Sequence, residues 1–397
     1  MKQPAKKILF LGGASSQVPA IKYALQLGCH VITVDYLPNN PGHKISDEYY
    51  NISTVNKEKI LELSLELNID AISAYASDPA AETAAYVSEK LGLVGSSYES
   101  TKTLSNKILF RSFLENNNFK VPWFLSNENV DSISKNYTDS QAILKPVDSS
   151  GSKGVYLINN KEELKLHFGD SKSYSKSGFV ILEEFIKKKG NQIHGEGFVI
   201  NGELSFILLG DQFFSPVNPL APYSTIVPSI CHASIMDELI LVVDSIIKKL
   251  KFKTGGINIE IIRDHNDNLY VLEIGARNGG NYMPQLMNHV SNVDLSKLNV
   301  EALLNQVSTK INFKTPKDYF AQVILHSCKS GVFRGLNIPN TIKDYVLEKN
   351  VYYKIGDRVN KYKNSKDVVG VIILRLKQEN LNDYFQALEA NKWVITI

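Results

Sequence analysis

Two glutamates near the middle of the chain have the spacing of a cation site. Glu260 and Glu273 each lie in an apolar run, and the stretch between the runs, Asp264 to Asn268, has the composition of a hairpin turn. Two strands paired in this way place both carboxylates side by side, which is costly unless a cation lies between them. Arg277 follows Glu273 closely and can hold an anion near that cation. Either glutamate alone is better explained as a solvated strand-end residue, but the three together predict a site for Mg²⁺ or Mn²⁺ beside a phosphate group.

Two glycine-containing segments have the composition of phosphate-binding loops. Gly12 to Gln17 lies between an apolar run and a helical pattern, where free amides can receive an anion; a tight strand-to-helix turn explains it equally well. Ser149 to Val155 is a run of small residues that contains Lys153 and follows Lys145. Small residues let a backbone lie over a polyphosphate, and lysines neutralise its charge. Neither segment has the glycine pattern of the dinucleotide fingerprint or of the P-loop.

A further polar group follows the next apolar run. The sequence Glu183-Glu184-Phe185-Ile186 closes that run, and Gln192 and His194 come soon after it. A segment of this kind can present backbone groups to the edge of a purine while side chains reach the ribose. Taken alone it is a short match, and a single histidine is more often a structural residue.

The elements that must position these residues indicate an α/β and α+β protein with several domains. Short apolar runs alternate with helical patterns over the first hundred residues, which is typical of a doubly wound parallel sheet with helices on both faces. We expect this domain at residues 1–98, a second at 99–307 and a small α+β domain at 308–397. Residues 170–176 are predicted to be an exposed loop, and residues 213–228 a loop that faces the substrate. Predicted strands are 8–11, 31–35, 71–75, 142–144, 180–182, 196–200, 204–209, 256–263, 269–274, 319–326 and 368–374; predicted helices are 18–27, 57–67, 79–91, 107–116, 236–250 and 381–390.

Composition excludes several classes of protein. The 397 residues include 44 Lys and Arg against 41 Asp and Glu, an excess too small to indicate a nucleic-acid partner. Cys29, Cys231 and Cys328 are too far apart for a zinc motif, so we expect buried, reduced thiols. No apolar stretch approaches the ~20 residues that span a bilayer. We therefore expect a soluble, cytoplasmic protein with no membrane partner.

Taken in chain order, these motifs resemble the ATP-grasp superfamily. The resemblance is to the branch that contains biotin carboxylase, the carbamoyl-phosphate synthase large chain, purine-pathway ligases such as phosphoribosylglycinamide synthetase, and bacterial L-amino-acid ligases. It covers residues 6–300 and extends less clearly to the C-terminal segment. It rests on the opening Gly-Gly loop, Ser77-Asp78-Pro79, Asn106-Lys107 with Arg111, Lys145-Pro146, Gly151 to Val155, Glu183 to Ile186, Glu260, and Glu273 to Gly280.

The resemblance implies a three-domain architecture with ATP bound in the middle domain. Residues 99–307 would be the ATP-grasp domain, and residues 121–187 would include its lid. The residues implied to bind ATP are Lys107 and Lys145 at the phosphates; Ser150, Gly151, Ser152, Lys153 and Gly154 in the loop over them; Glu183, Glu184, Phe185 and Ile186 at the adenine; and Gln192 and His194 near the ribose.

The resemblance also implies the metal and catalytic residues. Glu260 and Glu273 would bind Mg²⁺, while Arg277 and Lys145 would act in catalysis, with Arg277 holding an acyl phosphate or its carboxylate precursor. Two positions depart from the family pattern. Many relatives have Asn, a further metal ligand, at the position of Gly275, and an acidic residue that binds ribose at the position of Gln192.

The activity implied is that of an ATP-dependent carboxylate–amine ligase. A small carboxylate would attack the γ-phosphate to give an acyl phosphate, and an amine would then displace phosphate. Alternatives within the class are an enzyme like phosphoribosylglycinamide synthetase and a bicarbonate-activating carboxylase. A nucleotide-binding module without turnover is the alternative outside it. The partners would be small molecules, and the resemblance alone suggests a homodimer.

Overall fold

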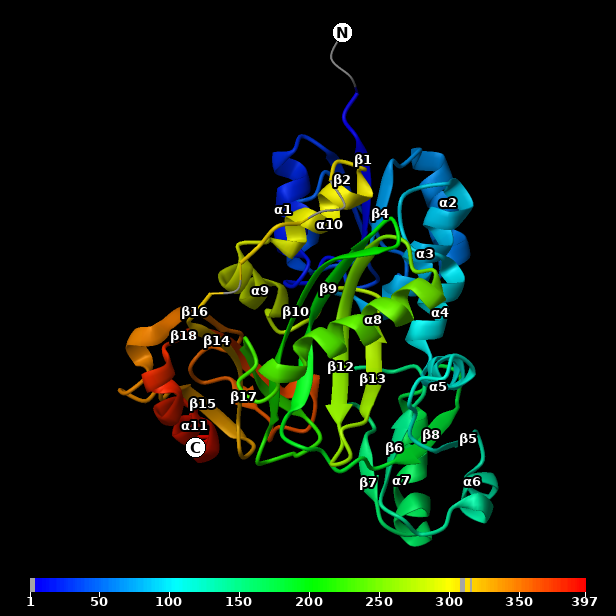
Figure 1. Ribbon diagram of the computed structural model, residues 1–397. Coiled ribbons are helices and arrows are strands. Elements are labelled where there is room, and N and C mark those ends of the chain that lie inside the picture. The colour runs from blue at the N-terminus through cyan, green and yellow to red at the C-terminus, as the bar shows by residue number, and fades with distance from the viewer. Residues whose placement is uncertain (1–3, 308–310, 315) are drawn as a thin grey trace.

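The chain folds around four β-sheets in the computed structural model, which describes residues 4–307, 311–314 and 316–397. The sheets form an N-terminal unit, a small lobe and a long antiparallel sheet (Figure 1). The long sheet continues into the C-terminal region. This mixed α/β arrangement is the fold class predicted from the sequence.

The N-terminal unit is a parallel sheet with the strand order β3-β2-β1-β4. Its apolar runs form buried strands, as predicted, because strands covered on both faces need no polar positions. The sequence did not indicate β3, which is short and only half-buried. The elements are β1 (Lys7–Leu11), α1 (Val18–Gln26), β2 (His30–Val34), β3 (Glu48–Tyr50), α2 (Lys57–Leu67), β4 (Ala71–Ser73) and α3 (Asp78–Leu91).

A helix from much later in the chain completes this unit. Helix α10 (Leu295–Leu303) packs beside α1, and its Val300 and Leu303 share a core with Ile8 and Phe10 of β1 (Figure 1). Residues 4–98 therefore do not account for the whole core of the N-terminal unit.

The small lobe is an antiparallel sheet with the strand order β5-β8-β6-β7 and two helices. Residues 170–173, predicted to be loop, are instead the last turn of α7. Leu164, Phe168 and Ser171 are buried at helical spacing, so packing carries the helix through a segment rich in Lys and Ser. The elements are β5 (Phe124–Asn127), α6 (Val130–Asn136), β6 (Ala142–Pro146), β7 (Tyr156–Ile158), α7 (Lys161–Ser173) and β8 (Val180–Glu184).

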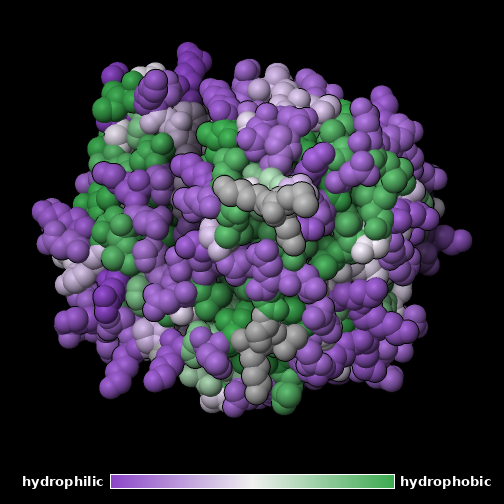
Figure 2. All heavy atoms as spheres, turned by 90° about the horizontal axis from the view of Figure 1, so that it is seen from above, coloured by the Kyte–Doolittle hydropathy of each residue, from purple (hydrophilic) through white to green (hydrophobic). Residues whose placement is uncertain are grey.

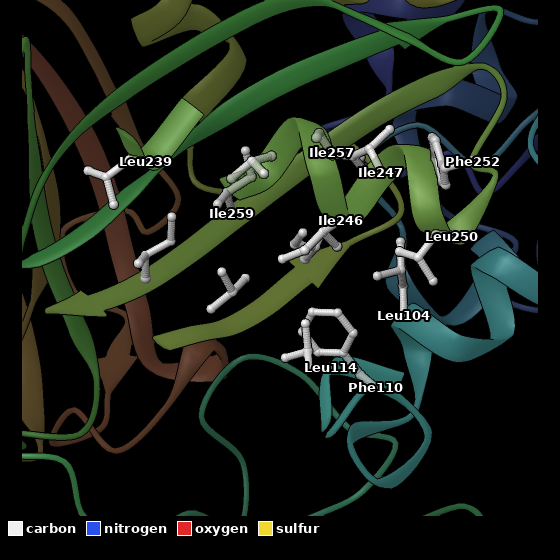
Figure 3. Packing of buried hydrophobic residues seen from close by; sticks show 14 of the residues in the cluster. Leu104, Phe110, Leu114, Leu239, Ile246, Ile247, Leu250, Phe252, Ile257 and Ile259 are labelled. Atoms are coloured by element: carbon white, nitrogen blue, oxygen red, sulfur yellow. The ribbon is translucent and has the colours of Figure 1, made fainter. Parts of the chain in front are cut away.

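The long sheet has the strand order β13-β12-β9-β10-β11-β14-β18-β16. Helix α8 packs its apolar stripe on β12 and the neighbouring strands, and Figure 3 shows Ile246, Ile247 and Leu250 against Ile257 and Ile259. The elements of the sheet's first half are β9 (Gln192–Ile200), β10 (Glu203–Phe214), β11 (Pro222–Val227), α8 (Met236–Leu250), β12 (Gly255–Arg263) and β13 (Leu269–Gly275). Helices α4 (Tyr98–Ser105) and α5 (Lys107–Asn116) connect the N-terminal unit to the small lobe, and α9 (Met283–Ser291) follows β13.

The C-terminal region extends this sheet and also forms a smaller sheet of its own. Strand β14 pairs with β11, and β18 and β16 follow it to the edge. This second, three-stranded sheet and α11 share a core that includes the buried side chains of Trp393 and of Tyr384 on α11. The elements are β14 (Tyr319–His326), β15 (Gly331–Leu336), β16 (Val346–Val351), β17 (Arg358–Val359), β18 (Val368–Leu376), α11 (Leu381–Ala390) and β19 (Val394–Thr396).

The surface carries both hydrophilic and hydrophobic residues. On the face seen in Figure 2, hydrophilic residues surround separate hydrophobic patches. No helix of the described residues has the length and apolar character needed to cross a membrane. The three cysteines are free, but only Cys29 is buried; Cys231 and Cys328 are exposed because they lie in loops, so the prediction of three buried thiols was wrong for these two.

Candidate functional site

The two glutamates of the sequence prediction lie opposite each other on neighbouring strands. Glu260 of β12 pairs in register with Glu273 of β13, and both line a cavity of about 660 Å³ between the long sheet and the small lobe. Burial and the neighbouring Glu273 carboxylate raise the pKa of Glu260 to about 7. Two carboxylates in this arrangement repel each other, and a cation between them would remove the repulsion.

The donor set suits Mg²⁺ bound together with a phosphate ligand. Within the described ranges, no group of three or more His, Cys, Asp or Glu side chains is placed to hold a metal ion by itself. Mg²⁺ commonly binds through one or two carboxylates, and phosphates and water complete its octahedron. Glu260 and Glu273 therefore fit a cation that arrives with a polyphosphate.

Lys145 reaches the cavity from β6 and is held there by a buried ion network. The Glu183 carboxylate of β8 pairs with Lys145 and accepts a hydrogen bond from Arg111 Nε at 3.1 Å. Burial acts to raise the pKa of Glu183, but Arg111 and Lys145 lower it to about 2. The Glu183 side chain is thus fully engaged in positioning Lys145, and only the backbone of this residue remains for an adenine contact.

Lys107 and the Gly-rich loop, residues 149–155, cover the end of the cavity that contains Glu260 and Glu273, which we call the phosphate end. Asn106 caps α5 by accepting hydrogen bonds from the amides of Ile108 and Leu109, which fixes Lys107 in the first turn. Lys107 Nζ then donates to the Ser149 carbonyl at 2.8 Å. The loop residues Ser149, Ser150, Gly151, Ser152 and Lys153 all line the cavity, whereas Gly154 lies behind them against the backbone of Ser171.

The hinge between the small lobe and the long sheet borders an apolar slot. Glu184, Phe185 and Ile186 line the cavity, and the amides of Glu184 and Phe185 donate to the carbonyls of Trp123 and Gln141. Aliphatic side chains line this slot, which suits an apolar, planar base. Sequence reasoning had given no role to three aliphatic residues of this slot, Ile143, Ile262 and Leu272, whereas Val155 closes the predicted loop.

Gln192 and His194 point into the cavity from β9 with their polar atoms already paired. Gln192 Nε2 donates to Glu260 Oε2 at 3.1 Å, so this residue supports the carboxylate pair. His194 lies between Thr225 Oγ1 at 2.9 Å and Asn258 Nδ2 at 3.0 Å. Burial lowers the pKa of His194 to about 4, so the ring is neutral at pH 7 and accepts a hydrogen bond from Asn258.

Arg277 makes a bidentate ion pair that the sequence had not indicated. Its Nε and Nη2 atoms donate to the two oxygens of Asp78, at the start of α3, at 2.6 and 2.7 Å. Burial acts to raise the pKa of Asp78, yet Arg277 holds it below its ordinary value. A Cβ at Gly275 would only be in van der Waals contact with this pair, 3.4 Å from the guanidinium carbon of Arg277 and 3.5 Å from Asp78 Oδ1, so the pair does not itself require glycine there.

A buried glutamate that sequence reasoning missed holds the loop after Arg277. Glu196 of β9 accepts hydrogen bonds from Asn258 Nδ2 at 2.8 Å, Asn278 Nδ2 at 3.2 Å and the Gly279 amide at 2.8 Å. Burial raises its pKa to about 7. Its polar role has no signal in the sequence, because its partners lie in distant segments.

The far end of the cavity is polar but carries few charges. Its walls come from the β10–β11 connection, the α9 approach and β14, and its members are Asn218, Leu220, Pro222, Ser224, Thr225, Asn281, Met283, Gln322 and Ile324. Half of the predicted substrate-facing loop 213–228 is strand, at the end of β10 and in β11, while its residues 218–220 are loop and line the cavity. Tyr223 of β11 faces away, into the C-terminal core, where its hydroxyl accepts from the indole of Trp393.

The Gly12 to Gln17 segment is satisfied within itself. Gln17 Oε1 accepts from the Ala14 amide at 2.9 Å, and Gln17 Nε2 donates to the Leu11 carbonyl at 2.9 Å. Of the two alternatives for this segment, the structure shows the tight strand-to-helix turn. No residue of the segment lines the cavity.

Comparison with known proteins confirms the resemblance noted in the sequence. Residues 104–281 match a family model described as an ATP-grasp domain. The chain is 28% identical over 186 residues to a formate-dependent phosphoribosylglycinamide formyltransferase of Prochlorococcus marinus (strain NATL1A), a match that covers 46% of this chain and 48% of that protein. The chain thus spans about half the length of that relative.

Two further similarities extend over most of the chain. An L-arginine-specific L-amino acid ligase of Bacillus subtilis is 22% identical over 354 residues, covering 84% of this chain and 82% of that protein. The crystal structure of an L-amino acid ligase from Bacillus licheniformis superposes with a TM-score of 0.79 at 18% identity, covering 100% of both chains. At this identity the structural match establishes the fold.

Proposed function

Because the chain carries an ATP-grasp domain at residues 104–281, we propose that the protein is an ATP-dependent carboxylate–amine ligase that releases ADP and phosphate. The observation that carries the proposal is the convergence of Glu260 with Glu273, Lys145 with Glu183, and Lys107 on one cavity that also has an aliphatic slot. A nucleotide fits with its base in the slot and its phosphates at the lysines and glutamates.

The residues of this chain would act on phosphoryl transfer by position and charge. Lys107 and Lys145 neutralise the phosphates, and Glu260 and Glu273 would hold Mg²⁺, which offsets charge on the transferring group when bound. A substrate carboxylate oxygen bonds to the γ-phosphorus while the bond between the γ-phosphorus and the ADP oxygen breaks. Arg277, aligned by Asp78, borders the place where the resulting acyl phosphate would lie.

The second half of the reaction needs an enclosed site. An amine nitrogen bonds to the activated carbonyl carbon, phosphate leaves with the bridging oxygen, and the nitrogen loses a proton. We expect the small lobe to close over the cavity and exclude water that would hydrolyse the intermediate. No protein nucleophile is required, so catalysis depends on positioning and electrostatics.

The far end of the cavity favours an uncharged or modestly polar carboxylate over a phosphoribosyl substrate. Its walls are mostly neutral amides, hydroxyls and aliphatic groups, and His194 is uncharged at neutral pH. Two further cations line the cavity: Lys188 lies over the Phe214 ring, and Arg277 is paired with Asp78. A phosphate ester is normally bound by Arg or Lys side chains. This lining supports a ligase for small acids such as amino acids ahead of the purine-pathway and bicarbonate-dependent alternatives.

A nucleotide-binding module without turnover is the competing explanation. Such a module needs no pair of carboxylates for a cation and no buried network to hold Lys145. The presence of both in one cavity counts against it.

The test is release of phosphate and ADP from Mg-ATP with a panel of small carboxylates and amines. We expect turnover only when a carboxylate and an amine are both present, and a loss of at least about 100-fold in Glu273→Ala. Glu203→Ala, an exposed position on β10 of the same sheet, is the matched control and should keep its activity. Undiminished turnover in Glu273→Ala would reject the cation site, and ATP binding with no ADP formed by any pair would favour the module.

A further inference from the structure

A second cavity lies behind the phosphate end of the first. Its volume is about 560 Å³, and residues of the N-terminal unit, helices α4 and α5, and the small lobe line it. The two cavities share a wall, because Lys107, Ser149, Ser150, Lys153 and Glu273 line both. We call the second one the lysine cavity, after Lys57, Lys102, Lys107, Lys153 and Lys176 in its lining.

Most acidic groups of the lysine cavity are already engaged. Asp78 is paired with Arg277, and Glu273 belongs to the carboxylate pair. Asp148 accepts hydrogen bonds from Ser175 Oγ and from the amides of Lys176 and Ser177. The acidic groups that remain are Glu58, which is exposed, and Glu82, which is partly buried. Burial raises the pKa of Glu82, and the ammonium groups of Lys176, Lys102 and Lys57 act against this, so Glu82 is a carboxylate that faces these lysines.

The lysines are engaged to a smaller extent. Lys57 donates to the hydroxyl of Tyr98, and Lys107 donates to the Ser149 carbonyl. Among the described residues, Lys102, Lys153 and Lys176 form no ion pair with a carboxylate. The cavity thus has three ammonium groups available: Lys102 on α4, Lys153 in the Gly-rich loop, and Lys176, which is exposed, in the loop after α7.

Two of these ammonium groups, those of Lys153 and Lys176, also repel each other. Burial lowers the pKa of Lys153, the ammonium groups of Lys366 and Lys176 lower it further, and the Asp78 carboxylate acts in the opposite direction. An anion among like charges of this kind relieves their repulsion. The repulsion and the unpaired lysines therefore indicate the same kind of ligand.

We propose that the lysine cavity is a binding site for a small anion that carries a phosphate or carboxylate group, held by Lys102, Lys153 and Lys176. This proposal rests on the proposed ligase function for the source of the anion. One source is the phosphate released when the amine displaces it, which is formed on the other side of the wall of Lys107 and Glu273. The other source is the anionic group of an amine substrate.

Calorimetric titration of the full chain saturated with MgADP tests the proposal. ADP occupies the first cavity, and the probes are inorganic phosphate and glycine, each added separately. The variant carries Lys102→Gln with Lys176→Gln, and its control carries Lys90→Gln with Lys165→Gln. The control removes the same charge from exposed positions of the same two regions, outside the cavity.

We expect phosphate to bind to the wild type and to the control, and at least tenfold more weakly to the variant. If glycine shows the same loss, the source is a substrate carboxylate; if only phosphate does, the source is the product. No binding of either probe, or equal binding to variant and control, would overturn the proposal. The titration requires no turnover, so its failure is distinct from a failure of phosphate release in the ligase assay.

Discussion

At the scale of single residues, the site depends on charges that are buried in pairs. Glu183 lies between Lys145 and Arg111, and Arg111 is completely buried. Such a network holds the Lys145 ammonium at one place in the cavity. The same burial makes the network intolerant of losing one member, because the remaining charges have no solvent to compensate them.

We expect Glu183→Gln to lower the free energy of unfolding by about 3–5 kcal/mol, since it leaves two buried cations without their carboxylate. Urea unfolding followed by circular dichroism measures the change. Asp244→Asn breaks the exposed pair with Lys248 on α8 and should cost less than about 1 kcal/mol. Equal effects of the two substitutions would show that the network is not buried as described.

Glu196 gives the protein a pH dependence of opposite sign to that of an ordinary ion-paired carboxylate. Its folded pKa of about 7 lies above its ordinary value of 4.5, so the folded state binds the proton more tightly. The contribution of this proton to the free energy of unfolding is therefore complete below about pH 4.5. It is lost as the pH rises to about 7, at up to ~1.4 kcal/mol per pH unit.

Glu196→Gln should remove this dependence. We expect the difference in unfolding free energy, variant minus wild type, to grow in favour of the variant from pH 4.5 to 7 and then to stay constant. Urea unfolding at a series of pH values measures it, and other titrating groups cancel in the difference. A difference that does not change with pH would mean that Glu196 titrates as an exposed carboxylate does.

At the scale of elements, the Gly-rich loop is held by the C-terminal region. The Ser365 amide donates to the Gly151 carbonyl at 3.2 Å. The C-terminal segment that contains Ser365 is itself held by Asn218 of the β10–β11 connection, whose Nδ2 donates to the Lys363 carbonyl at 2.7 Å. Gly151 has a φ of 72°, and a Cβ there would collide with the Ser365 side chain. The loop over the phosphate end therefore requires glycine at this position for both backbone and packing reasons.

We expect Gly151→Ala to raise the KM for ATP about tenfold, since a left-handed conformation costs alanine about 1–2 kcal/mol before the collision is counted. Steady-state kinetics measures it once a substrate pair is known, and nucleotide titration measures it before then. Gly169→Ala in α7 is the control, because a Cβ there meets nothing within 4 Å. It should leave the KM unchanged and stabilise the helix by about 0.5–1 kcal/mol. A Gly151→Ala protein with normal nucleotide affinity would contradict the role of the loop.

At the scale of the whole molecule, local patterns were predictable and long-range pairings were not. The parallel sheet followed from apolar runs that alternate with helices, and the Glu260–Glu273 pairing followed from a hairpin between two adjacent strands. Helix α8 begins and ends as its apolar periodicity predicts. These features depend on residues close together in the chain.

Features that join distant segments had no local signal. Strand β14 pairs with β11, α10 returns to the N-terminal unit, and Arg277 reaches Asp78 across 199 positions. The sequence indicated β14, Asp78 and Arg277 only as separate pieces, and it indicated neither β11 nor α10. Which pieces meet is decided by the packing of the whole chain, so Glu196 and the lysine cavity became visible only in the folded structure.

The cavity is likewise a product of the whole molecule. Its phosphate end comes from α5, the Gly-rich loop and β12–β13, and its far end includes Gln322 and Ile324 of the C-terminal β14. An acid held at that far end and a nucleotide held in the slot would meet at the carboxylate pair. Transfer of a phosphoryl group to a carboxylate is therefore the central claim of the account.

The most direct test follows oxygen during turnover with Mg-ATP, an amine, and a carboxylate labelled with ¹⁸O in both oxygens. If an acyl phosphate forms and the amine displaces phosphate from it, one labelled oxygen must appear in the released phosphate, and mass spectrometry detects it. We predict this transfer in the wild type, with a loss of turnover in Glu273→Ala. Released phosphate without the label, formed at the same rate as ADP, would contradict activation of the carboxylate by ATP.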